Sequence, residues 1–505
     1  MNTSSRREFL NGICRQTLYA SVGLALVQRA GFGASSMLLA RERLRFGALD
    51  PLVDLMQGTE ADALLPLLVK KLKSGTPLSD LVGAGALANA RGHGGTDYNG
   101  YHALMALVPS YEVAAQMPAG LEALPVLKVL HRNTRFLHDA NRSADDALAP
   151  IQDPRGEGTL AEALRARKLE RAERNLAVAE SESTAQAWEE IQTVVRDEVN
   201  VHRVVLAWRA YDLLRLTGSE HGLTLLRQPV RFCIDEDTAR AGRGHSPETL
   251  RALLAELMAR HGLNERERGT RPADLATLER LAASFYASDR TAAAAAAAEA
   301  LAAGTDPEDV GRALSLASAR LLLHDLGQER ASAGKPIGSV HGASIGVHAS
   351  DAANAWRCLA RVGSAKNAFA SLIAGAYHTA EQAGGFPAHA HDHDAIAPTV
   401  SEPGALLDQC ASHIRARDQK QACAAARRYC ELGHGPEALF SVLLPFAVSE
   451  DGALHAEKFF RTAQEEHGRA QPAHRAIYLV ALTRVMASHQ GFPAPGVDEA
   501  RRLLA

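Results

Sequence analysis

Amphipathic helical patterns fill most of this 505-residue sequence and constrain its fold more than any other feature. Apolar residues recur at intervals of three and four along residues 51–90 and 122–139, as in helices that face a core. Aromatic residues make up only 5% of the chain, and Ala and Leu dominate its apolar fraction, which favours close-packed helices over sheets. We therefore predict an all-α protein, a multi-helical array of antiparallel helix pairs.

The length and charge of the chain limit its organisation and its partners. A chain of 505 residues can bury one large core or two ordinary ones, and we expect two helical lobes, residues 35–265 and 266–505, around a central histidine-lined cleft. One run, PVRFCID at residues 229–235, reads as a strand. The formal net charge of -3 and the lack of a basic stripe argue against a nucleic-acid partner.

The N-terminus resembles a twin-arginine export signal. The run SSRREFL at residues 4–10 contains the paired Arg6 and Arg7, and the apolar run at residues 18–27 is too short to span a bilayer. This layout predicts a cleavable signal peptide over residues 1–34. The resemblance implies the twin-arginine translocase as a partner and a periplasmic or secreted protein, exported already folded. No later apolar run is long enough for a membrane anchor.

The stretch from residue 324 to residue 381 is the richest in candidate chemistry. It contains His324, His341, His348 and His378 among glycine, alanine and serine residues. Small residues let helices approach closely, so we expect these imidazoles to meet in a shared interior.

The spacing of the histidines constrains any metal site. His341 and His348 are seven residues apart, about 10 Å along a helix, so they need ligands from another helix to share one ion. Glu198 and His202 are four apart, a spacing at which helical side chains meet. We therefore expect His102, from another part of the chain, to complete a site. The metal candidates are His102, His341, His348, Glu198 and His202, with iron, copper, manganese or zinc as the ion.

Three segments resemble the questin oxidase-like family, and together with LPVLKVL (124–130) they also resemble uncharacterised exported helical proteins. The three segments are GYHALMAL (100–107), HGASIGVHASDAANAWRCL (341–359) and FASLIAGAYHTAE (369–381). The first resemblance implies oxidative chemistry on an aromatic ketone or quinone. It gives as catalytic candidates His102, His341 and His348.

We expect these three histidines to line one cavity, with four further residues in its wall: His324, His378, Tyr98 and Tyr377. A cavity with a few convergent polar groups is the usual form of a binding site. The sequence leaves two functions open. One is an oxidoreductase that acts on a small organic substrate, and the other is a non-catalytic helical scaffold or ligand-binding protein of the periplasm.

Overall fold

The computed structural model describes residues 43–96, 98–139, 147–152, 155–243, 248–287, 289–331, 337–340, 344–384 and 392–505. The predicted signal peptide and His341 lie outside these residues. Residues Leu44–Ala505 pack as one compact unit.

The prediction of an all-α fold is confirmed. The described residues form α-helices and short 3₁₀ helices, and their only β-type pairings are two isolated bridges, Arg271 with Thr305 and Glu450 with Pro493. The helices of the first half are α2 (Asp50–Gly58), α3 (Ala61–Lys73), α4 (Leu78–His93), α5 (Tyr98–Ala114), α6 (Leu124–Leu137), α7 (Leu160–Arg165), α8 (Leu169–Glu182), α9 (Thr184–Val195), α10 (Val201–Asp212), α11 (Leu214–Thr217), α12 (Gly222–Ala241) and α13 (Glu248–Arg260).

The second half continues in the same way. Its helices are α14 (Leu275–Tyr286), α15 (Arg290–Ala302), α16 (Pro307–His324), α17 (Ile345–Val362), α18 (Ala365–Ala383), α19 (Pro403–Arg415), α20 (Gln419–Glu431), α21 (Pro436–Ser449), α22 (His455–Arg469), α23 (Arg475–His489) and α24 (Val497–Leu504). The 3₁₀ helices are η1 (Gly47–Leu49), η3 (Ser219–His221), η4 (Asp392–Ala395), η5 (Gly452–Leu454) and η6 (Pro472–His474).

The strand prediction for residues 229–235 is wrong, because this run lies inside α12. Its apolar residues are buried on more than one face, since α12 packs against α8, α9 and α10. A helix covered on several sides loses the amphipathic pattern that identifies it in sequence, and a short apolar run then looks like a buried strand.

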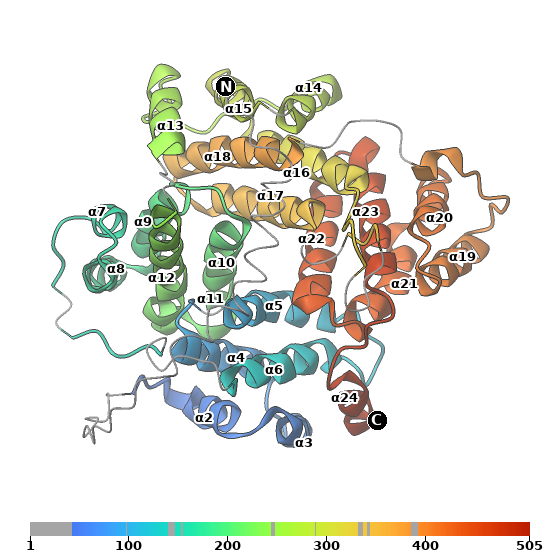
Figure 1. The fold of residues 1–505 in the computed structure, drawn as a ribbon, viewed down its shortest axis with the longest axis horizontal. Helices are drawn as coiled ribbons and strands as arrows, with labels where there is room; N and C mark the ends of the chain where they lie inside the picture. The colour runs from blue at the N-terminus through green and yellow to red at the C-terminus, as the bar shows by residue number, and fades with distance from the viewer. Residues whose placement is uncertain are drawn as a thin grey trace. The chain divides into compact units, whose positions relative to one another are not determined.

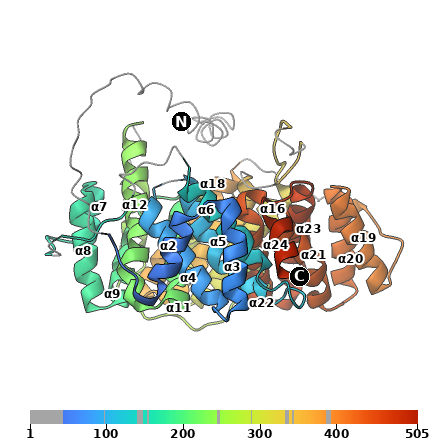
Figure 2. The ribbon, with the colours of Figure 1, turned by 90° about the horizontal axis from the view of Figure 1, so that it is seen from below.

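Four helices meet in the middle of the unit. In Figure 1, α5, α10, α17 and α22 are grouped between α4 and α6 below and α16 and α18 above. Within the group, α5 packs against α10 and α22, and α17 packs against the same two helices. The pairs α7–α8 and α19–α20 lie at opposite sides of the unit in both Figure 1 and Figure 2. These four central helices carry the candidate site.

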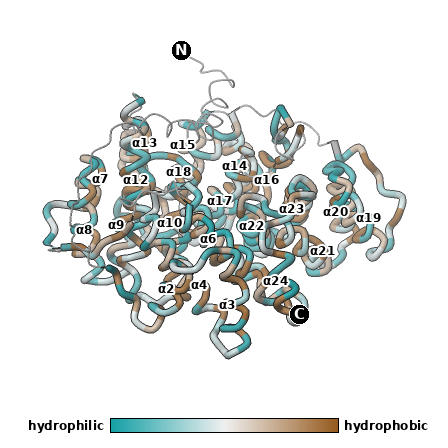
Figure 3. The backbone as a smooth tube through the Cα atoms, turned by 60° about the horizontal axis from the view of Figure 1, so that its bottom comes forward, coloured by the Kyte–Doolittle hydropathy of each residue, from teal (hydrophilic) through white to brown (hydrophobic). Residues whose placement is uncertain are grey.

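One large apolar core runs through the unit. Its buried side chains extend from Phe46 to Ala500 and include many alanines, which allow the close helix packing expected from the composition. Hydrophobic and hydrophilic residues alternate along the helices, as Figure 3 shows. The lobe boundary at residue 265 stays a prediction.

Among the described helices, none combines the length and the apolar character that a bilayer span requires.

Candidate functional site

Four imidazoles from four helices stand in a circle, which we call the histidine ring: His102, His202, His348 and His455. The centroid of the His102 imidazole lies 4.9 Å from that of His202 and 5.2 Å from that of His455. The centroid of His348 lies 5.4 Å from each of the same two neighbours. The circle follows the packing of α5, α10, α17 and α22.

Each member of the histidine ring stands near the N-terminus of its helix. His455 opens α22, His202 is the second residue of α10, His348 is the fourth of α17 and His102 is the fifth of α5. The N-terminal end of a helix carries a partial positive charge. Four such ends therefore meet around the ring and disfavour protonated imidazoles.

Local sequence fixes two of these helix starts. Asn200 caps α10, because its side-chain oxygen accepts a hydrogen bond from the backbone N–H of His202 at 2.8 Å. Gly100 lets α5 lie close to α4, since a Cβ at this position would stand 2.5 Å from Cγ of His93. A larger residue at position 100 would push the start of α5, and His102 with it, away from α4.

Within the histidine ring, three imidazole nitrogens are buried without a hydrogen-bond partner among the described residues: Nε2 of His102, His202 and His348. In His102, Nδ1 lies 2.7 Å from the carbonyl oxygen of Tyr98, and in His455 it lies 3.1 Å from that of Ala453. A carbonyl only accepts, so Nδ1 carries the proton in both bonds and Nε2 keeps its lone pair. Histidines that bind metals are held in this way.

Burial keeps the imidazoles neutral. It is the main reason why the pKa values of His102 and His202 lie well below the ordinary 6.5, and it lowers the pKa of His348 to about 4. The positive charge of Lys458 lowers all three pKa values further. Neutral imidazole is the form that binds a metal or accepts a proton.

Lys458 is the buried cation beside the histidine ring. Its side chain is 2% exposed, and burial lowers its pKa to about 8, although the nearby Asp351 raises it. Asp351 itself accepts a hydrogen bond from the hydroxyl of Thr462 at 2.9 Å. Lys458 follows His455 by three residues on α22 and Asp351 follows His348 by three on α17, so both lie close behind the ring.

Aromatic side chains connect the histidine ring with the surface. Tyr98 is 48% exposed, and its ring centroid lies 4.3 Å from that of His102. Tyr101 is buried, 5.4 Å from His202 and 5.2 Å from Phe232. A planar ligand could stack on Tyr98 directly beside the imidazoles.

The histidine ring has roughly the dimensions of a metal site. Two imidazoles on a tetrahedral metal, each with a bond of about 2.1 Å, have their centroids about 5 Å apart. In the described part of the chain, no group of three or more His, Cys, Asp or Glu residues is arranged so that it could hold a metal ion. Metal binding therefore requires the imidazoles to turn inward.

The remaining predicted site residues lie in other surroundings. Glu198 accepts a hydrogen bond from the N–H of Val199 and pairs with Arg240 at 3.3 Å. Tyr377 packs under the guanidinium of Arg290, with Cζ 5.0 Å from the ring centroid. Both residues are engaged locally and do not belong to the histidine ring.

The two histidines predicted for the cavity wall differ in position. His378 accepts a hydrogen bond from the indole N–H of Trp356 at 3.2 Å, and its pKa is lowered mainly by burial and further by the neighbouring His348. His324 bonds the carbonyl of Arg320 at 2.9 Å and packs against Tyr286. The structure thus brings together His102, His202 and His348, with His378 behind them and Tyr98 at the surface.

Sequence reasoning missed His455 and Lys458. Both lie in the segment GALHAEK, where a histidine opens a helix shortly after a glycine, a setting similar to those of His102 and His348 but not of His202. Applied throughout the chain, this criterion would have found His455. Nothing in the local sequence distinguishes Lys458 from an ordinary surface lysine.

No protein-family model matches the chain, and comparisons with curated proteins and with solved structures found no match.

Proposed function

We propose that the protein is a metal-dependent oxidoreductase that binds one transition metal through the histidine ring and acts on a small organic substrate. One observation carries the proposal: four helices place one imidazole each within 4.9–5.4 Å of its two neighbours in the ring, and three of these imidazoles have a buried Nε2 without a partner among the described residues. Buried nitrogens of this kind normally have a partner, and a bound ion or ligand would supply one. Imidazole ligands suit iron, copper, nickel and zinc.

Two further features support redox chemistry on an aromatic molecule. The half-exposed ring of Tyr98 offers a stacking surface next to His102. The sequence resemblance to questin oxidases implies oxidation of an aromatic ketone or quinone. In the proposed site, Lys458 supplies a positive charge that stabilises an anion formed beside the ring.

The direct test is metal analysis of protein purified without a histidine tag. We expect about one equivalent of iron, copper, manganese or zinc, and loss of this metal in each single alanine variant of the histidine ring. His467→Ala is the matched control, because His467 lies at the other end of α22, against Phe440. The metal-loaded protein should consume dioxygen with quinones or aromatic ketones, and the ring variants should not.

A non-catalytic scaffold or ligand-binding protein is the second candidate. The observation in its favour is that no metal-holding group of donors exists among the described residues as they stand. If the purified protein contains no metal and takes up none on titration, the proposal of a metal-dependent oxidoreductase is wrong, and a metal-free enzyme or the second candidate is left.

We also propose that the twin-arginine translocase exports the protein to the periplasm or the exterior. The paired Arg6 and Arg7 support this. Replacing both by lysine should keep the protein in the cytoplasm of an export-competent host. Arrival of the double variant in the periplasm would exclude the twin-arginine route.

A further inference from the structure

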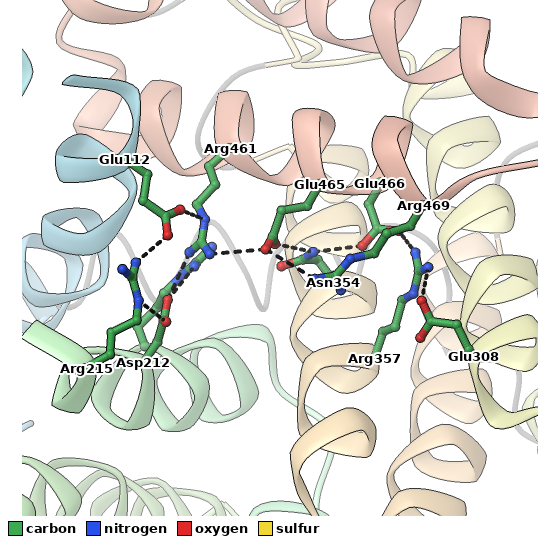
Figure 4. A network of polar contacts seen from close by, with 11 residues as sticks. Glu112, Asp212, Arg215, Glu308, Asn354, Arg357, Arg461, Glu465, Glu466 and Arg469 are labelled. Atoms are coloured by element: carbon green, nitrogen blue, oxygen red, sulfur yellow. Dashed lines mark hydrogen bonds and ion pairs between the residues drawn. The ribbon is translucent and has the colours of Figure 1, made fainter. Parts of the chain in front are cut away.

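The four helices of the histidine ring meet a second time, in a partly buried ionic layer further along their length. Figure 4 shows this layer, in which carboxylates and guanidinium groups from different helices alternate. Glu112 follows His102 by ten residues, Asp212 follows His202 by ten, and Glu465 follows His455 by ten. Ten helical residues correspond to about 15 Å. We call the ionic layer the set Glu112, Arg209, Asp212, Arg215, Glu308, Asn354, Arg357, Arg461, Glu465, Glu466 and Arg469.

Arg461 is the centre of this layer. Its guanidinium pairs with Glu112 of α5, with Asp212 of α10 at 2.9 Å, and with Glu465 of its own helix, α22, at 3.1 Å. The side chain is 9% exposed. A single planar group thus connects three of the four helices that carry the histidine ring.

The fourth helix, α17, is connected through Asn354 and Arg357. Asn354 donates to Glu465 at 3.0 Å and to Glu466 at 2.7 Å. Arg357 pairs with Glu466, and both side chains are almost fully buried. Arg357 also reaches Glu308 of α16 at 2.6 Å. Every helix of the histidine ring is therefore held in the ionic layer.

We propose that the ionic layer sets the register of the four helices, and that Arg461 is the positioning residue for the histidine ring. Helix faces rich in alanine offer little resistance when one helix slides along another. A guanidinium does resist such sliding, because its N–H donors point in fixed directions. A slip of one residue moves a histidine by about 1.5 Å and turns it by about 100°. Metal sites tolerate errors of only about 0.2 Å in bond length. Buried ion pairs add little net stability, so geometric definition is their more valuable contribution.

The test uses metal-free protein with ¹³C in the imidazole rings, so it reports on the ring whether or not a metal binds. In Arg461→Met, the NMR signals of the ring histidines should shift or broaden relative to the wild type. Arg461→Lys should have a smaller effect, because it keeps the charge but loses the fork. The matched control is Arg227→Met, which removes a paired, buried guanidinium bonded to Glu173 at 2.8 and 2.9 Å between α8 and α12, outside the ring helices.

A second measurement rests on the proposed function. If the wild type binds a metal, Arg461→Met should lower its affinity for Co²⁺ about 10- to 100-fold. This is the usual effect of mutating a residue that orients the metal ligands without binding the metal itself. Arg227→Met should leave the affinity unchanged. If Arg461→Met does not fold, Glu112→Leu removes one connection at a partly exposed position and should shift the His102 signal.

The outcomes separate the two proposals. Unchanged imidazole signals in a folded Arg461→Met variant, or equal changes in Arg227→Met, would refute the positioning role. Absence of metal binding in the wild type would refute the proposed function alone, and the NMR comparison would still decide the role of Arg461.

Discussion

The histidine ring and most of the ionic layer lie on the same four helices, but only the ionic layer pairs its groups with opposite charges. In the ring, Nε2 of His102, His202 and His348 is buried without a partner among the described residues. In the ionic layer every guanidinium faces at least one carboxylate, and Arg461 alone faces three, although one nitrogen each of Arg209, Arg357 and Arg469 has no hydrogen-bond partner among the described residues. A buried unpaired polar group costs about 1–3 kcal/mol. The ionic layer therefore has a structural explanation, and the histidine ring calls for a functional one.

The largest effect should follow from breaking the ionic layer at Arg357. In Arg357→Met, the carboxylate of Glu466 stays buried and loses its cation, so the free energy of unfolding should fall by about 3–5 kcal/mol. Urea unfolding measures the loss. Arg260→Met is the control, because its pair with Glu256 is exposed and should contribute at most about 0.5 kcal/mol. Similar losses in both variants would contradict the contrast between buried and surface pairs.

Low pH should destabilise the protein through its buried histidines. The pKa of His348 is about 4 and that of His378 about 3, both lowered mainly by burial, whereas histidines in the unfolded chain titrate near 6.5. Below about pH 6.5 the unfolded chain binds protons that the folded protein excludes. Each such histidine should therefore lower the stability by about 1.4 kcal/mol per pH unit, down to about pH 4.

The variant His378→Gln isolates one histidine of this set. Glutamine can still accept the hydrogen bond from Trp356 but does not titrate. Urea unfolding at pH 7, 6 and 5 should show that the free energy of unfolding falls less steeply with acid than in the wild type. Below about pH 6.5 the difference in slope should be about 1.4 kcal/mol per pH unit, which corresponds to one proton. An identical slope would mean that His378 is already protonated in the folded protein.

Thr462→Val should lower the stability by an intermediate amount. The hydroxyl of Thr462 donates to the buried carboxyl of Asp351, so its removal should cost about 1–3 kcal/mol. Thr483→Val is the control, because its hydroxyl donates to the carbonyl of Leu479 within its own helix rather than to a carboxylate, and it should cost less. Thermal unfolding compares the two. An equal or larger cost at Thr483 would argue against a special role for the Asp351 contact.

The smallest change in stability should come from the histidine ring itself. His348→Leu removes an unpaired nitrogen and keeps a buried side chain of similar size, so stability should stay the same or rise by about 1 kcal/mol. Metal binding and oxidation should be lost at the same time. A loss of 2 kcal/mol or more would instead identify His348 as a structural residue and favour the scaffold.

The sequence by itself determined the helical class of the protein and several of its candidate residues. Helix periodicity and alanine content act locally, so the all-α fold could be predicted without knowing any long-range contact. His102 and His348 could be named because each stands near a helix start that contains a glycine, and His202 because it follows Glu198 by four residues. The strand predicted at residues 229–235 failed where packing on several sides of α12 removed the local signal.

The tertiary structure alone decided which histidines meet. About 100 or more residues separate each member of the histidine ring from the next, and their meeting depends on how α5, α10, α17 and α22 pack. The same packing brought in His455 and buried Lys458, which the sequence did not single out. Helix formation is encoded within a few turns of chain, whereas helix partners are selected by the burial of whole faces. For that reason the elements could be predicted from the sequence, and the site required the fold.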